Sequence, residues 1–319
     1  MRFTATLLLL SLTASPALAQ NTPPAVIAET RAAIAAGDFA KAEGVVAADR
    51  KARGVTPENL EAQSWLGRGA LAAKQYDKAE QYAGATYDLA TAELKKRSMD
   101  EEPRLPIALG AAIEVLGQVG TARGQRTEAV SFLRGELDKY KATSLYKRIQ
   151  KNINLISLDG QKAMALDSTE FLGARPPSLD SLKGKVVLLF FWAHWCPDCK
   201  TMGPVLERLL TKYGPQGFTV VSPTQRYGYV AGGKSAPAAM EMGYIAEVRD
   251  RFYPWMAKQA VPVSEQSLKD YGVSTTPTVV LVDRAGVISL YNPGQMKEEA
   301  IEPLIRRLVE QKSATSMPE

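Results

Sequence analysis

Two cysteines and one histidine are the residues of this 319-residue chain whose types and spacing favour redox or metal chemistry. Cys196 and Cys199 are the chain's two cysteines, and His194 is its single histidine. A disulfide between the cysteines would close a very short loop, so it would restrain the unfolded chain little as a structural staple. Structural zinc would need two further ligands, from the one histidine or from carboxylates, which such sites seldom use. The pattern therefore favours a redox-active dithiol and predicts no metal site.

The two cysteines lie where a predicted strand passes into a predicted helix. Residues 186–190 are apolar and rich in β-formers, which indicates a buried strand. Residues 201–213 place apolar side chains at helical spacing on one face. The start of a helix offers unpaired N–H groups and the positive end of the helix dipole, and both favour a thiolate.

The segments after the dithiol alternate between strand and helix patterns. Strands are expected at 218–222, 278–282 and 287–291, helices at 238–259, 264–271 and 298–311, and a short strand pair within 163–179. Alternation that ends in a hairpin and a helix indicates an α/β fold with a mixed sheet.

The first half of the chain has a different character, since residues 24–146 are Ala-rich and helical in period. A glycine-containing motif recurs in them, beginning near Gly37, Gly67 and Gly117, and it resembles the helix hairpins of tetratricopeptide (TPR) repeats. We expect a TPR-like array of helix hairpins over residues 20–158. Such an array would present a concave surface to partners, or it would serve as a spacer or dimerisation module.

The amino terminus reads as a secretory signal peptide over residues 1–19. It has a basic start at Arg2, a short apolar core and an Ala-x-Ala end at Ala19. Cleavage near Ala19 would leave a soluble protein that is secreted or periplasmic. The net charge of +5 is spread over interleaved acids and bases, which argues against nucleic-acid binding and against a polybasic membrane patch.

Three motifs, Trp-Cys-x-x-Cys-Lys, Pro204 eight residues after the first cysteine, and a Tyr-Gly-Val segment that leads to Pro277 and Thr278, together resemble the thioredoxin superfamily. Residues 182–187, which lead into Phe-Trp-Ala-x-Trp-Cys, and the extra segment between the second strand and Pro277 are closer to its exported TlpA/ResA-type branch. The likeness covers roughly residues 163–309. It implies a thioredoxin-like domain, which we place at 159–312 before a disordered tail at 313–319, a cis Thr276–Pro277 bond facing the disulfide, and thiol–disulfide exchange.

Within this resemblance the site residues have expected roles. Cys196, at the helix start and towards solvent, is expected to be the attacking thiolate, and Cys199 to resolve the mixed disulfide. Pro197 fits the first helical turn because its missing N–H would be unpaired there anyway. Trp195, Pro197, Thr276 and Pro277 are expected to contact an extended substrate.

Two departures from the family pattern bear on the redox balance of the site. Thioredoxins carry a buried aspartate where this chain has Phe190, so proton transfer must use water or another carboxylate. Glu170 falls where exported relatives carry a glutamate, although it could equally be an exposed strand residue. Asp198 between the cysteines disfavours the thiolate, whereas His194 would favour it if protonated and is otherwise a solvated loop histidine.

A phosphate-loop pattern at residues 228–235 does not predict nucleotide binding. Five residues separate it from the preceding strand, and Pro237 follows where a phosphate-binding helix needs N–H donors. The segment is better interpreted as a flexible rim over the disulfide, with Tyr227 and Tyr229 placed to contact substrate.

The sequence thus predicts an exported protein-disulfide oxidoreductase, more a reductase than an oxidase, whose redox group is the Cys196–Cys199 pair and which needs no other cofactor. Its expected partners are a protein thiol or disulfide substrate, a membrane or soluble thiol electron donor, and a protein bound by the helical half. The alternatives are an oxidase or isomerase of the same fold, or a helical-repeat interaction protein whose thioredoxin domain only docks.

Overall fold

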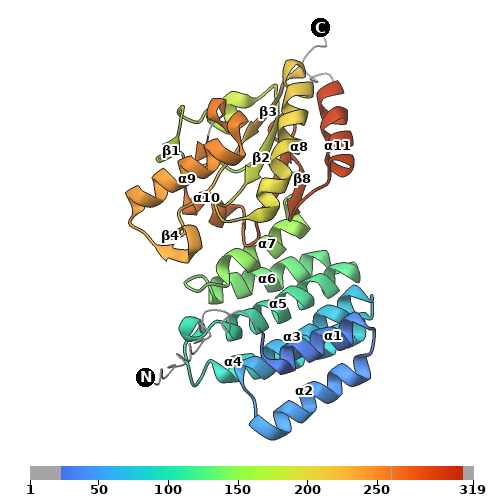
Figure 1. Cartoon of the computed structure of the whole chain (residues 1–319). Coiled ribbons are helices and arrows are strands. Elements are labelled where there is room, and N and C mark those ends of the chain that lie inside the picture. Colours follow the sequence, from blue (N-terminus) through green and yellow to red (C-terminus); the bar gives the residue numbers. More distant parts are fainter. Residues whose placement is uncertain (1–22, 260, 312–319) are drawn as a thin grey trace, which may run out of the picture.

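The computed structural model describes residues 23–259 and 261–311, which form a helical half followed by an α/β half (Figure 1). The predicted signal peptide and the predicted tail from residue 313 lie outside the described residues. The helical half contains α1 (Ala25–Ala35), α2 (Phe39–Arg53), α3 (Pro57–Ala72), α4 (Tyr76–Glu93), α5 (Arg104–Ala122), α6 (Arg126–Lys139) and α7 (Tyr146–Ser157).

Three helix hairpins succeed one another in this half, and each tight turn falls on the recurring motif. Gly37, Lys74 and Gly124 have φ values of 75°, 58° and 81°, a left-handed conformation that ends the first helix of each pair. Lys74 stands where the other two turns have glycine. The predicted hairpin array is therefore observed over α1–α2, α3–α4 and α5–α6, with α7 as an additional helix.

Small residues allow the paired helices to approach closely. A Cβ added at Gly67 would lie 3.5 Å from the backbone nitrogen of Ala83, and one added at Gly117 would lie 3.0 Å from the side chain of Leu133. α5 is long and apolar enough to cross a membrane by length and composition, but it packs against α3, α4, α6 and α7 as the core helix of this array.

The α/β half is built on a four-stranded mixed sheet in the order β3-β2-β7-β8. β2 (Val186–Phe191) pairs parallel with β3 (Phe218–Val221) and antiparallel with β7 (Thr278–Val282), which in turn pairs antiparallel with β8 (Ile288–Pro293). Every residue of β2 and β7 is buried, as expected for central strands whose two faces are both covered.

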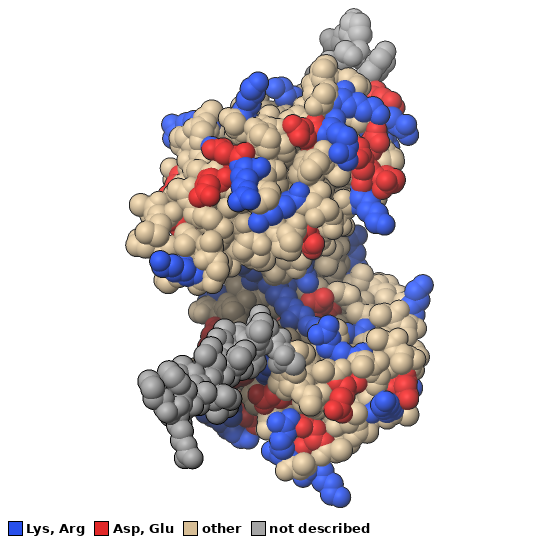
Figure 2. All heavy atoms as spheres, viewed as in Figure 1, with Lys and Arg blue, Asp and Glu red and all other residues tan. Residues whose placement is uncertain are grey.

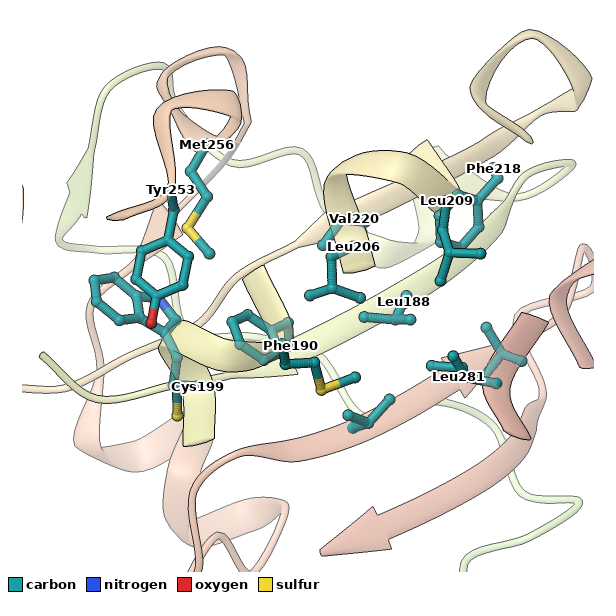
Figure 3. Packing of buried hydrophobic residues seen from close by; sticks show 14 of the residues in the cluster. Leu188, Phe190, Cys199, Leu206, Leu209, Phe218, Val220, Tyr253, Met256 and Leu281 are labelled. Carbon is teal, nitrogen blue, oxygen red and sulfur yellow. The ribbon is translucent and has the colours of Figure 1, made fainter. Parts of the chain in front are cut away.

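The side chains of β2 divide between two cores. Val186, Leu188 and Phe190 lie in the core on the side of α8 (Pro197–Tyr213), α9 (Ala238–Phe252) and α11 (Glu298–Glu310). Figure 3 shows Leu188 and Phe190 packed together with Leu206 and Leu209 of α8. The alternate residues of β2 face the second core, together with residues of α10 (Glu265–Asp270) and β8.

The segment before the dithiol differs from the prediction. No strand pair forms within 163–179; instead β1 (Phe171–Leu172) pairs with the distant β6 (Val261–Pro262). The local sequence could not reveal this pairing because the two strands lie some ninety residues apart. The predicted flexible rim contains a small hairpin, β4 (Tyr229–Val230) and β5 (Lys234–Ser235), and the predicted helix 238–259 is divided into α9 and a 3₁₀ helix (Pro254–Lys258).

The two halves meet through α7, which packs against α10 and β8. Gly272, with φ +59°, lies so close to this helix that an added Cβ would be 2.4 Å from the backbone nitrogen of Lys151. The Lys147 ammonium donates to Oε1 of Gln225 in the α/β half at 2.7 Å. α7 is thus in direct contact with the fold that carries the dithiol.

Candidate active site

Cys196 and Cys199 lie at the start of α8, immediately after the loop that leaves β2, as the sequence predicts. They form a disulfide with a Cα–Cα distance of 5.3 Å. Cys196 is the N-cap residue, and its Sγ accepts a hydrogen bond from the Cys199 backbone N–H at 3.0 Å. A backbone donor aimed at the first sulfur favours negative charge there, so the geometry suits Cys196 as the attacking thiolate.

The expectation that Cys196 faces solvent is wrong for this disulfide form. Cys196 is 1% exposed, and it belongs to the same apolar core as Cys199, Trp192 and Tyr253. The sequence position at a helix start predicts a favourable dipole but carries no information on what covers the sulfur.

Trp195 and Trp192 lie on the loop before the dithiol and have different environments. Trp195 is 45% exposed and contacts Tyr227 edge-on, with ring centroids 5.6 Å apart. Trp192 is buried, and its Nε1–H donates to the carbonyl of Ser222 at 3.1 Å. Trp195 is therefore an exposed indole next to Cys196 in the chain, whereas Trp192 has a packing role. Pro197, at the first position of α8, is also exposed.

Thr276 and Pro277 lie at the same end of the sheet as the dithiol. The peptide bond between them is cis. The next residue, Thr278, pairs with Phe191, the last residue of β2 before the loop to the cysteines. Thr276 Oγ1 is buried and has no hydrogen-bond partner among the described residues. The segment with the two cysteines and the segment with Thr276 and Pro277 therefore lie at the same end of the two central strands.

His194 is buried, so its interpretation as a solvated loop histidine is wrong. It is 1% exposed, and its Nε2 lies 3.2 Å from Oε1 of Glu241, which is likewise 1% exposed. The rings of Tyr227, Tyr229 and Tyr244 surround the imidazole edge-on at centroid distances of 5.2–5.5 Å. Sequence reasoning missed Glu241 because it lies on α9, 47 residues away from the histidine.

The Glu241 carboxylate also holds the loop that follows β3. Its Oε1 accepts a hydrogen bond from the Tyr227 N–H, and its Oε2 accepts one from the Gly228 N–H at 2.8 Å. Together with His194 these donors supply three hydrogen bonds to a buried carboxylate, which is the arrangement that permits a charge to be buried. Glu241 thus connects α9 to the Tyr227 loop and to His194, which lies two residues before Cys196.

The electrostatics of this pair follow from its burial. Burial lowers the pKa of His194, against the opposing effect of Glu241, so the imidazole is neutral near pH 7. In the tautomer with the proton on Nε2, the neutral imidazole donates this N–H to Oε1 of Glu241. Burial also raises the pKa of Tyr227, whose hydroxyl is buried without a partner among the described residues. Tyr227 therefore packs inside the site, and its exposure to substrate is smaller than the sequence suggested.

Glu170 and Asp198 occupy different surroundings. Glu170 directly precedes β1 and forms an ion pair with Arg226 Nη1 at 2.6 Å, with its side chain 38% exposed. A partly exposed carboxylate that is engaged by an arginine is a weak candidate for proton transfer to a buried thiol. Asp198 is exposed in the first turn of α8, between the two cysteines.

Phe190 fills the place of the thioredoxin aspartate with a fully buried ring that stacks edge-on with Tyr253. Figure 3 shows Cys199, Phe190 and Tyr253 in one apolar cluster. In residues 23–259 and 261–311, no group of three or more His, Cys, Asp or Glu side chains is arranged to hold a metal ion.

Comparison with known proteins gives matches that involve the second half of the chain. The family model of the thioredoxin-like domain matches residues 181–308. The thioredoxin-like protein YneN of Bacillus subtilis is 29% identical over 164 residues, which cover 51% of this chain and 87% of the relative. The thiol-disulfide oxidoreductase ResA of Bacillus thuringiensis is 25% identical over 130 residues, 41% of this chain and 67% of the relative.

Among solved structures, a thiol:disulfide interchange protein of the thioredoxin family from Chlorobium tepidum matches with 17% identity and a TM-score of 0.37. The match covers 47% of this chain and 96% of that protein.

Proposed function

We propose that this protein, whose residues 181–308 form a thioredoxin-like domain, is a thiol–disulfide oxidoreductase that acts on other proteins through Cys196 and Cys199. One observation carries the proposal: the two cysteines form a disulfide at a helix start, with the Cys199 N–H directed at the sulfur of Cys196. The name of the relative ResA, a thiol-disulfide oxidoreductase, supports the same chemistry.

The reaction proceeds by two exchanges. In the reducing direction, the Cys196 thiolate attacks one sulfur of a substrate disulfide, forms a mixed disulfide and releases the other substrate sulfur as a thiolate. The Cys199 thiolate then attacks Sγ of Cys196, which restores the Cys196–Cys199 disulfide and releases the second substrate thiolate. Two electrons pass to the substrate, and a thiol donor, membrane-bound or soluble, must return them.

We further infer that the reducing direction predominates. The exposed Asp198 between the cysteines and the buried Glu241 behind His194 both place negative charge near the dithiol. Negative charge disfavours the thiolate, which makes the reduced form a stronger electron donor. An oxidase or isomerase of the same fold remains the alternative, and the redox potential decides between them.

Export belongs to the proposal as well. Its support is the sequence of residues 1–19, with a basic start, an apolar core and an Ala-x-Ala end. The helical half would bind a partner, or it would act as a spacer for the domain that carries the dithiol.

Trapping tests the proposed function. A Cys199→Ser variant cannot resolve a mixed disulfide, so it should accumulate covalent complexes with substrate proteins. Dithiothreitol should reduce these mixed disulfides and release the substrate proteins. The double variant Cys196→Ser, Cys199→Ser should form none. If this double variant captures the same partners and supports the same phenotype as the unmodified protein, the domain only docks and the enzymatic function is refuted.

A further inference from the structure

A cluster of basic side chains lies on the inner row of the helical half. α1, α3, α5 and α7 pack side by side in that order, and three of them contribute Arg31, Arg68, Arg148 and Lys151. We refer to these four residues as the cationic inner surface. Figure 2 shows Lys and Arg side chains where the molecule is hollowed between its two halves.

Two of the four cations share one aromatic ring. The guanidinium carbons of Arg31 and Arg68 each lie 4.6 Å from the ring centroid of Trp65. Stacking on an indole fixes a guanidinium in position and leaves its N–H groups free for a ligand. Within the described ranges, neither Arg31 nor Arg68 forms an ion pair within 4.0 Å.

The other two cations share a single carboxylate. Glu114 Oε2 lies 3.0 Å from Arg148 Nε and 3.1 Å from Lys151 Nζ. The next carboxylate along this row, Glu61, is engaged by Arg104 at 2.7 Å. With Glu61 paired to Arg104, Glu114 is the one carboxylate that balances the four cations, and the surface carries a surplus of positive charge.

The proton affinities reflect this surplus. Burial, and then the charge of Arg148, lower the pKa of Arg68 to about 10. Although burial alone would raise it, Arg148 and Lys151 lower the pKa of Glu114 to about 2. Anionic groups are stabilised at this surface and cations are destabilised, which is the condition for binding an external anion.

The cationic inner surface adjoins the dithiol site through α7. Lys147, the residue immediately before Arg148 in α7, donates to Oε1 of Gln225 at 2.7 Å. Gln225 precedes the Tyr227 loop, and Tyr227 contacts both His194 and Trp195. A polypeptide lying on the inner surface can therefore continue toward the exposed Trp195.

We propose that the cationic inner surface docks an acidic segment of the protein whose disulfide is exchanged at Cys196. This inference rests on the proposed function and names its substrate class. Guanidinium groups pair with carboxylates in two-point geometry, and complementary charge accelerates encounter while disfavouring basic partners. The docked segment would supply binding energy far from the sulfurs, which the small exposed area at Trp195 does not.

Docking is measured separately from catalysis with a fluorescein-labelled decapeptide of alternating Asp and Glu that contains no cysteine. Its neutral counterpart of Asn and Gln is the control ligand. Fluorescence anisotropy with the full-length protein should show binding of the acidic peptide alone. This binding should weaken as salt rises from about 0.1 M to about 0.5 M, because the Debye length falls from about 10 Å to about 4 Å.

The test variant is Arg31→Gln, Arg68→Gln, and the matched control is Lys51→Gln, Lys95→Gln, which removes the same charge from exposed positions elsewhere. Because two exposed charge contacts are lost, the test variant should bind the acidic peptide roughly two- to thirtyfold more weakly, while the control is unchanged. The single variant Arg31→Gln, at an exposed position, gives the same direction if the double variant unfolds.

Equal affinity of the test and control variants, or equal binding of the neutral peptide, overturns the proposed docking. If the acidic peptide binds as expected but Cys199→Ser traps no substrate, the proposed function fails while the docking surface stands. If trapping succeeds and no acidic peptide binds, the docking proposal alone is refuted.

Discussion

Replacing Glu241 by Gln should destabilise the α/β half and loosen the loop beside the dithiol. The substitution keeps the size of the side chain and one carbonyl oxygen, but its amide NH₂ would face the Gly228 N–H, which now donates to Oε2 at 2.8 Å. One partly buried backbone donor then loses its acceptor, and the hydrogen bonds from Tyr227 and His194 lose their charge assistance. An unpaired donor costs about 1–3 kcal/mol when fully buried and less when water reaches it, and weakening two charged hydrogen bonds adds to this.

The expected loss of unfolding free energy is about 3 kcal/mol, or a fall in Tm of roughly 6 to 12 °C for a domain of this size. Thermal unfolding followed by circular dichroism measures it. Glu247→Gln is the matched control because Glu247 lies on the same helix, is exposed and forms no ion pair among the described residues. This control should stay within about 0.5 kcal/mol of the unmodified protein.

The same variant also has an electrostatic effect that a purely structural role would not produce. Removing a buried negative charge next to His194 favours the Cys196 thiolate, so the pKa of the Cys196 thiol should fall and the potential should become less negative. Thiolate absorbance of the reduced protein as a function of pH reports this pKa. The reasoning is refuted if Glu241→Gln and Glu247→Gln have the same Tm and the same thiol pKa.

Three further outcomes are expected. Because burial lowers the pKa of His194, the chain's single imidazole should titrate below 6.5 in a proton NMR experiment; a value above 6.5 would contradict its neutral state. The unfolded chain would then take up this proton first, so the unfolding free energy should decrease as pH falls below about 6.5, by at most about 1.4 kcal/mol per pH unit, and His194→Asn should reduce this slope. Gly272→Ala should lower the free energy of unfolding by roughly 2–4 kcal/mol because its Cβ would overlap the backbone of Lys151. The control Gly243→Ala, in an open helical position, should be neutral or slightly stabilising. Equal Tm values for the two variants would show that α7 does not pack against Gly272.

Much of the fold follows from local sequence. The strand before Cys196 and the helix after it are short-range patterns. The strand was located within one residue, and the helix ends at Tyr213 as predicted but begins at Pro197, four residues before the periodic pattern. The turns at Gly37 and Gly124 could be predicted because left-handed backbone selects glycine. Lys74 shows the limit of that rule, since this turn has the same left-handed backbone although the residue is not glycine.

The features that sequence reasoning missed are long-range. The partner of His194 is 47 residues away, and nothing in the pattern around Glu241 distinguishes it from an exposed helical glutamate. The pairing of β1 with β6 and the burial of Cys196 likewise depend on tertiary packing. Glu170 shows that a matching sequence position does not fix a role: it falls where exported relatives carry a glutamate, yet its side chain pairs with Arg226.

The redox potential of the Cys196–Cys199 pair, measured by equilibration with glutathione, decides whether this protein is a reductase. We expect a single two-electron transition at or below the potential of thioredoxin, about −270 mV, as for a reductase. A potential near −120 mV would contradict the reducing direction, and a pair that does not exchange with glutathione at all would contradict thiol–disulfide exchange as the function of this protein.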